Sequence, residues 1–134
     1  MTSFCHHLGI FTNNPQELIK FYTEKLGFER RETKAIPEDL VKKIFGVSCS
    51  CKLTKLKFSQ VIIEIISPEN LKLKKRHDDV SGFNHWSLGV KNKEAFSKQL
   101  KKKGVSILEL EKNGQSIYFA RDPEGNLIEI YEVR

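Results

Sequence analysis

Two histidines and two glutamates occupy matching places in the two halves of the sequence. His7 and His85 lie on the first hydrophobic segment of each half, and Glu64 and Glu129 each stand between two isoleucines in the last one. Imidazole and carboxylate groups suit divalent first-row metals such as Zn, Ni, Co, Fe or Mn. Four protein ligands leave positions open for water or substrate, as a catalytic metal site requires. The pattern therefore predicts a metal centre that takes ligands from both halves.

Each of these residues also has an ordinary structural interpretation. A single strand histidine is more often a core or surface residue than a ligand, and strand glutamates often lie on a solvated face or pair with Lys or Arg. However, an ionised carboxylate among the isoleucines around Glu64 costs several kcal/mol unless it is paired, hydrogen-bonded or metal-bound. Two histidines in register with two such glutamates favour the metal. His6 should point away from the His7 face, and we expect His77 at the surface.

The residues that share a strand face with the two histidines are small. Gly9 follows His7, and Ser87 and Gly89 follow His85, each at the spacing that returns to the same face of a strand. A strand face thinned in this way leaves room for an ion or a ligand.

The segments that must position these residues form an internal repeat, in which strand, helix and three strands are read twice. In the first half we expect strands over residues 4–11, 28–34, 49–56 and 61–66, a helix capped by Asn14 and closed by Gly27, and a short helix over 37–46. In the second half we expect strands over 83–90, 105–110, 116–120 and 127–133, a helix from Asn92 to Gly104, and a tight turn over 122–126. This order predicts an α+β fold of two βαβββ modules. We expect a single domain over 1–134, with module one at about 4–66, a linker at 67–82 and module two at 83–134.

Composition limits the class of protein. The 134 residues are 39% hydrophobic and 30% charged, which excludes disordered and collagen-like chains and suits one domain. No apolar run approaches the roughly 18 residues that span a bilayer, and residues 1–4 resemble no signal segment. The three cysteines form no CxxC pair, and Cys49 and Cys51 would share one face of a strand. We expect a soluble, cytoplasmic protein with reduced thiols and no membrane contact.

The net charge of +6 comes largely from basic runs at 72–76 and 101–103. Neither run is interleaved with aromatic residues, and no DNA- or RNA-binding motif is present. We therefore expect solvated cationic faces and no nucleic-acid partner.

Several motifs together resemble the vicinal oxygen chelate superfamily, which includes glyoxalase I, methylmalonyl-CoA epimerase, extradiol dioxygenases, fosfomycin-resistance thiol transferases and bleomycin-binding proteins. The motifs are His7-Leu8-Gly9-Ile10, Phe21-Tyr22, Leu26-Gly27-Phe28, His85 to Val90, and Asp122-Pro123-Glu124-Gly125-Asn126-Leu127-Ile128-Glu129. The resemblance implies paired modules whose curled mixed sheets form a cup around one metal. Each module then supplies one ligand from its first strand and one from its last, namely His7, Glu64, His85 and Glu129.

The ligand set determines which activity the resemblance implies. A complete His/Glu/His/Glu set is most similar to glyoxalase I, whereas the dioxygenases and fosfomycin enzymes leave the Glu64 position unused and the epimerases usually have Gln there. This implies a metal-dependent isomerase or lyase that moves a proton next to a carbonyl of a small oxygenated substrate. Glu129 is the first choice for the base and Glu64 the second. The alternatives are a non-catalytic drug- or metabolite-binding protein of the bleomycin-resistance type and an iron-dependent ring-cleaving dioxygenase.

One position departs from the family pattern. Bacterial-type glyoxalase I has a glutathione-binding Arg four residues beyond the first His, and this chain has Phe11 there. Glutathione recognition is therefore not predicted. Basic linker residues can instead meet an anionic substrate. The aromatic residues can line an apolar wall or fill the core; they are Phe11, Phe21, Phe58, Trp86 and Phe119. The family also implies a homodimer, with the modules paired within one chain or swapped between two.

Overall fold

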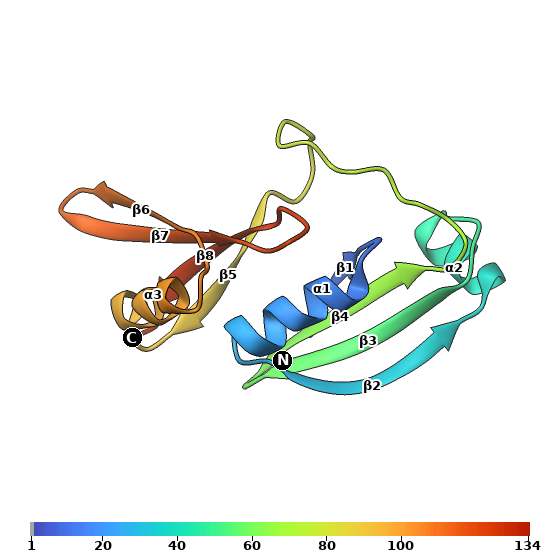
Figure 1. Cartoon of the computed structure of the whole chain (residues 1–134), viewed down its shortest axis with the longest axis horizontal. Helices are drawn as coiled ribbons and strands as arrows, with labels where there is room; N and C mark the ends of the chain where they lie inside the picture. The colour runs from blue at the N-terminus through green and yellow to red at the C-terminus, as the bar shows by residue number, and fades with distance from the viewer. Residues whose placement is uncertain (1) are drawn as a thin grey trace. The chain divides into compact units, whose positions relative to one another are not determined.

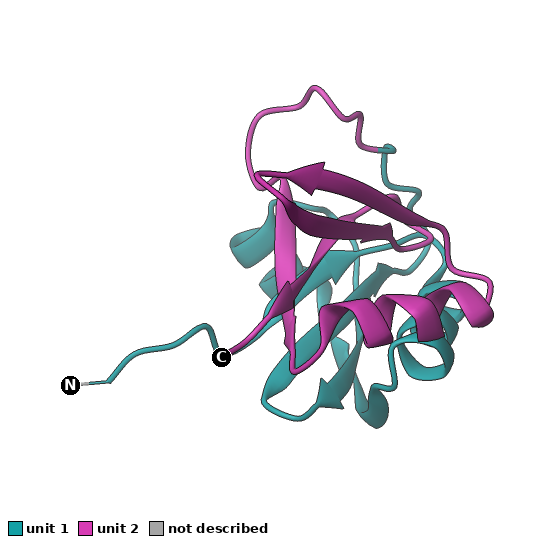
Figure 2. Cartoon of the chain, turned by 90° about the vertical axis from the view of Figure 1, so that its left-hand side faces the viewer, with its two compact units in different colours: residues 1–75 teal, residues 76–134 magenta. Residues whose placement is uncertain are grey.

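The computed structural model describes residues 2–134, which form two compact units, unit 1 up to residue 75 and unit 2 from residue 76 to 134 (Figure 2). Each unit has its own four-stranded mixed sheet. The predicted α+β fold of two βαβββ repeats is confirmed.

Unit 1 is a sheet with the strand order β1-β4-β3-β2 (Figure 1). Its elements are β1 (Leu8–Phe11), α1 (Pro15–Lys20), the π-helical turn η1 (Phe21–Lys25), β2 (Glu29–Ile36), α2 (Glu38–Phe45), β3 (Cys51–Phe58) and β4 (Val61–Pro68). β1 runs parallel to β4, and β3 is antiparallel to both of its neighbours. The first and last strands of the repeat are therefore adjacent.

The predicted helix after Asn14 begins as expected with α1, but the α-helix ends at Lys20 and the π-helical turn η1 continues it to Lys25, shortly before Gly27. The side chain of Asn14 accepts a hydrogen bond from the amide of Glu17, and Gly27 adopts a φ of 87°, which favours glycine after a helix. α1 contacts β4 and buries Leu18 and Ile19. It therefore covers one face of the sheet.

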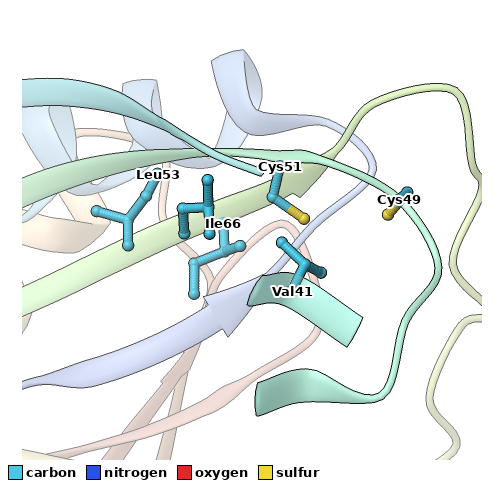
Figure 3. Packing of buried hydrophobic residues seen from close by; sticks show 6 residues of the cluster. Val41, Cys49, Cys51, Leu53 and Ile66 are labelled. Atoms are coloured by element: carbon cyan, nitrogen blue, oxygen red, sulfur yellow. The ribbon is translucent and has the colours of Figure 1, made fainter. Parts of the chain in front are cut away.

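A second apolar cluster in unit 1 surrounds α2. Val41 of α2 is fully buried and points toward Cys51 and Ile66 of the sheet (Figure 3). The other members of the cluster are Ile36, Cys49 and Leu53, with Val47 packed against them. Ile66 shares its strand face with Glu64, because the two are separated by one residue. α2 therefore covers part of the face that carries Glu64.

The predicted strand that contains both cysteines begins two residues later than expected, at Cys51, so Cys49 precedes β3. Both thiols are nevertheless buried in the α2 cluster. Burial, together with the neighbouring Cys49, raises the pKa of Cys51 to about 11. Cys51 is therefore a neutral thiol at physiological pH.

This arrangement predicts selective thiol chemistry. Iodoacetamide at neutral pH should modify Cys5 in the folded chain, because Cys5 is exposed, and leave Cys49 and Cys51 unmodified. All three should react in denaturant. Mass spectrometry counts the adducts, and rapid modification of Cys51 without denaturant would contradict the burial.

Unit 2 repeats the plan, with the strand order β5-β8-β7-β6. Its elements are β5 (His85–Val90), α3 (Lys93–Lys102), β6 (Ile107–Lys112), β7 (Gln115–Arg121) and β8 (Leu127–Glu132). β5 runs parallel to β8. Asn92 caps α3 by accepting from the amide of Ala95 at 2.9 Å. The turn after β7 is held by Asp122, whose carboxylate accepts from the amides of Glu124 and Asn126.

The element boundaries differ from the prediction mainly at the start of the chain. The first strand begins at Leu8 and not at residue 4, because its pairing with β4 begins at Leu8 and Ile63. His7 therefore precedes the first strand. No helix or strand lies between Pro68 and His85. Among the helices of residues 2–134, none combines the length and apolar character needed to cross a bilayer.

Candidate functional site

In unit 1, the parallel pairing of β1 with β4 brings His7 and Glu64 together. Gly9 is the register partner of Glu64, and His7 lies two residues earlier. The Nε2 atom of His7 lies 3.3 Å from Oε1 of Glu64, whose side chain is 19% exposed. A largely buried carboxylate therefore lies against an imidazole in unit 1.

His6 does not point away from His7 as predicted. Its Nδ1 atom lies 2.9 Å from Nδ1 of His7, a hydrogen bond in which one ring donates and the other accepts. The alternation of side chains applies only within a strand, and both histidines precede β1. His6 thus orients the His7 ring, whose Nε2 faces Glu64.

In unit 2, β5 and β8 build the matching pair. Nε2 of His85, the first residue of β5, lies 3.7 Å from Oε1 of Glu129, whose side chain is 26% exposed. Ser87 is the register partner of Glu129, and its hydroxyl donates to the same carboxylate oxygen at 2.9 Å. In the sequence, Ser87 stands out only for its small size, which gives no sign of this hydrogen bond.

Asn84 was also missed, although its position directly before His85 was a visible signal. Its Oδ1 atom lies 2.8 Å from Nδ1 of His85. An amide oxygen only accepts, so Nδ1 of His85 donates to it. The neutral ring then carries its lone pair on Nε2, the atom that faces Glu129, as metal-ligating histidines require.

The donor atoms fit a metal ion. Two atoms that each lie about 2.1 Å from one ion, at angles of about 90° to 120°, are about 3.0 to 3.6 Å apart. The separations of 3.3 Å for His7 and Glu64 and 3.7 Å for His85 and Glu129 are close to that range. No group of three or more His, Cys, Asp or Glu that could hold a metal forms within residues 2–134. Within each unit, the structure brings one histidine and one glutamate of the predicted set next to each other.

The two pairs have different neighbours across the sheet. Lys55 of β3 is the register partner of Glu64, whereas Phe119 of β7 is the partner of Glu129. Nζ of Lys55 lies 3.1 Å from Oε1 of Glu32. A backbone hydrogen bond and Lys55 lower the pKa of Glu32. A cation therefore lies beside one glutamate and an aromatic ring beside the other.

Among the five predicted wall aromatics, Phe119 contacts a site residue, with its ring 5.9 Å from that of His85. Phe11 instead packs edge-to-face on Phe45 of α2, at 5.4 Å. The remaining three have structural partners: Phe21 contacts Tyr22, Phe58 contacts Phe28, and Trp86 is the register partner of the buried Ile128. Most of the aromatic residues therefore serve packing.

A hollow of about 250 Å³ in unit 2 lies away from this site. It is lined by Glu94, Ser97, Lys98, Lys101, Glu109, Ser116 and Tyr118. Tyr118 is the register partner of Ile130, so it points to the face opposite Glu129. The hollow therefore belongs to the α3 side of the sheet.

The sequence profile of the glyoxalase/bleomycin resistance protein/dioxygenase superfamily matches residues 5–130. The chain therefore belongs to this superfamily, and the resemblance drawn from its motifs is confirmed. The activities in the family's description all concern small molecules.

Solved structures with this fold match nearly the whole chain. A glyoxalase family protein from Enterococcus faecalis has a TM-score of 0.72 at 24% identity, covering 96% of this chain and 97% of its own. The trypanothione-dependent glyoxalase I of Leishmania major has a TM-score of 0.70 at 24% identity, covering 98% and 87%. A glyoxylase/bleomycin resistance protein/dioxygenase domain from a Frankia species has a TM-score of 0.73 at 16% identity, covering 100% of both chains. Identities this low establish the fold alone. No curated protein matches the sequence.

The hydrogen bond from His85 to Asn84 predicts a tautomer. Replacing Asn84 with Leu removes the hydrogen-bond acceptor and keeps a side chain of similar size. The population of the Nδ1–H tautomer of His85 should then fall toward the mixture of tautomers expected for the exposed His77. Long-range ¹H–¹⁵N spectra of the metal-free chain measure the two forms. An unchanged tautomer in Asn84→Leu would show that Asn84 does not set it.

Proposed function

We propose that the chain is a divalent-metal-dependent isomerase or lyase of the glyoxalase type, which moves a proton next to a carbonyl of a small oxygenated substrate. The observation that carries the proposal is the equivalence of the two His–Glu pairs. Glu64 is held against His7 in the same way as Glu129 is held against His85, at 3.3 and 3.7 Å. A three-ligand dioxygenase site has no use for Glu64, so its placement favours the four-ligand class.

The metal would be held by His7, Glu64, His85 and Glu129, with Zn, Ni, Co, Fe or Mn as candidates. When bound, such an ion supplies Lewis-acid stabilisation of the negative charge that develops on oxygen as the neighbouring proton leaves. The residues around the ligands support this role. His6 and Asn84 each engage the second nitrogen of a ligand ring, which leaves Nε2 directed at the carboxylate.

We assign the proton transfer to Glu129 and keep Glu64 as the alternative base. The two carboxylates differ in their register partners, which are Ser87 for Glu129 and Gly9 for Glu64. The Ser87 hydroxyl fixes one oxygen of Glu129 at 2.9 Å, so its second oxygen has a defined position for taking and returning a proton. Glycine at the equivalent place offers Glu64 no such bond.

Metal binding is the first test of the proposal. Elemental analysis after dialysis should find one divalent ion per set of four ligands, and calorimetry should show that His85→Ala or Glu64→Ala weakens binding by more than the roughly 10- to 100-fold typical of outer residues. Ser87→Ala should weaken it by about 10-fold. His77→Ala is the matched control, because His77 is an exposed histidine outside the pairs, and it should change nothing. Stoichiometric metal binding that survives Glu64→Ala would exclude the four-ligand site.

Proton exchange is the second test. Incubation with 2-oxo compounds and hemithioacetals in deuterated water should produce metal-dependent loss of the α-proton signal in ¹H NMR. Glu129→Gln should slow this loss by about 10²- to 10⁴-fold, the usual contribution of a positioned base.

The same experiments separate the rival functions. Oxygen consumption with a catechol that survives Glu64→Ala would identify a dioxygenase. Compound binding that ignores both the metal and His85→Ala would identify a sequestering protein. Sedimentation of the metal-loaded chain tests the expected homodimer.

A further inference from the structure

The hollow of unit 2, whose lining residues come from α3, β6 and β7, takes no part in the proposed reaction. Its floor is formed by its two buried residues, Ser97 of α3 and Tyr118 of β7, which are 1% and 5% exposed. Tyr118 precedes Phe119 on β7, and consecutive strand residues face opposite sides of a sheet. The hollow is therefore separate from His85 and Glu129, and we call it the α3 hollow.

The floor of the α3 hollow carries a hydroxyl group that is left unsatisfied. A serine within a helix can donate to the carbonyl four residues earlier, which here belongs to Lys93. Within residues 2–134, however, the hydroxyl of Ser97 is buried and has no hydrogen-bond partner. A buried hydroxyl without a partner costs free energy comparable to that of a lost hydrogen bond. A ligand in the hollow that reaches this group would remove that cost.

The internal repeat shows what the serine replaces. Asn14 caps α1 and Asn92 caps α3, and the residue five positions after the cap is Ile19 in α1 and Ser97 in α3. Both residues are buried. Unit 1 thus fills this position with an apolar side chain that belongs to its core, whereas unit 2 has a short polar side chain that lines the hollow.

The rim of the α3 hollow is charged, but its charges are balanced. Nζ of Lys98 lies 3.3 Å from Oε1 of Glu94, and Nζ of Lys101 lies 3.7 Å from Oε1 of Glu109. Each pair leaves a second carboxylate oxygen and further ammonium protons for a ligand. A ligand with a net charge would be repelled by one member of each pair. A hydroxyl group both donates and accepts, so it matches both members.

We propose that the α3 hollow binds a small neutral polyhydroxylated compound, a polyol or a monosaccharide, whose hydroxyl groups bond Ser97 at the floor and the two ion pairs at the rim. The volume of about 250 Å³ equals that of roughly eight molecules of liquid water, which limits the ligand to about the size of a monosaccharide. Ser116 and Tyr118 contribute two further hydroxyl groups to the lining. The inference is independent of the proposed function, because the lining contains no member of the His–Glu pairs.

Titration of the ¹⁵N-labelled chain with glycerol, D-ribose and D-glucose tests the proposal, because amide shifts in ¹H–¹⁵N spectra locate the binding surface. At least one compound should shift the amides of Ser97 and Tyr118 to saturation, with the millimolar dissociation constant expected of so small a ligand. Polyols also act on every protein surface by being excluded from it. Shifts that spread over both units and grow linearly with concentration would therefore overturn the proposal and leave a hollow that holds water only.

Inorganic phosphate separates a neutral ligand from an anion. It should cause no saturable shift at the α3 hollow, because Glu94 and Glu109 would repel it. Saturable binding of phosphate in place of all three hydroxylated compounds would show an anion site and overturn the proposal.

Matched variants assign the binding to the hollow. Ser97→Ile places there the residue type that unit 1 has, and it should fill the hollow and weaken binding by more than about 10-fold. Ser97→Ala, which removes only the hydroxyl, should weaken binding by about 2- to 10-fold, the equivalent of one hydrogen bond. Lys101→Gln should have an effect of the same size, whereas Lys102→Gln removes the same charge from a residue outside the lining and should change nothing. Circular dichroism checks the folding of each variant, and unchanged binding in Ser97→Ala and Lys101→Gln would overturn the proposal.

Discussion

Parallel pairing between the first and last strands of each unit is the constraint on which the candidate site depends. Residues that are distant in sequence become neighbours only because β1 lies beside β4 and β5 lies beside β8. The register then sets the partners: Glu64 faces Gly9, and Glu129 faces Ser87. A register shift by one residue would turn Glu64 to the face covered by α1 and Glu129 to the face covered by α3. An unpaired charge is costly on either of these faces. The burial of the α1 and α3 faces therefore holds the register and, through it, both His–Glu pairs.

The two units share a His–Glu pair but differ in the residues that surround it. Across the sheet from its glutamate, unit 1 has Lys55 and unit 2 has Phe119. Unit 1 inserts α2 between its outer strands and buries the cysteines beneath it, while unit 2 has only a tight turn. The pairs supply the same donor atoms in both units, and their surroundings differ in charge and in cover. The two units therefore keep the same pair of donor groups in unequal surroundings.

Phe11 stands at the position where bacterial-type glyoxalase I has a glutathione-binding arginine. In this structure the ring of Phe11 packs on Phe45 and supports α2. That helix covers part of the Glu64 face. Phe11 therefore serves the packing of unit 1.

The sequence by itself determined the elements and the repeat, because helix caps, alternating hydrophobic residues and turn motifs act over a few neighbouring residues. Only the tertiary structure decided which histidine meets which glutamate and how the rings are held. His6 joins His7 because the ladder begins at Leu8, so strand alternation does not reach it. Ser87 bonds Glu129 through a strand contact 42 residues apart in the chain. Such contacts depend on register and on where pairing starts, which are set by packing across the whole sheet and not by local pattern.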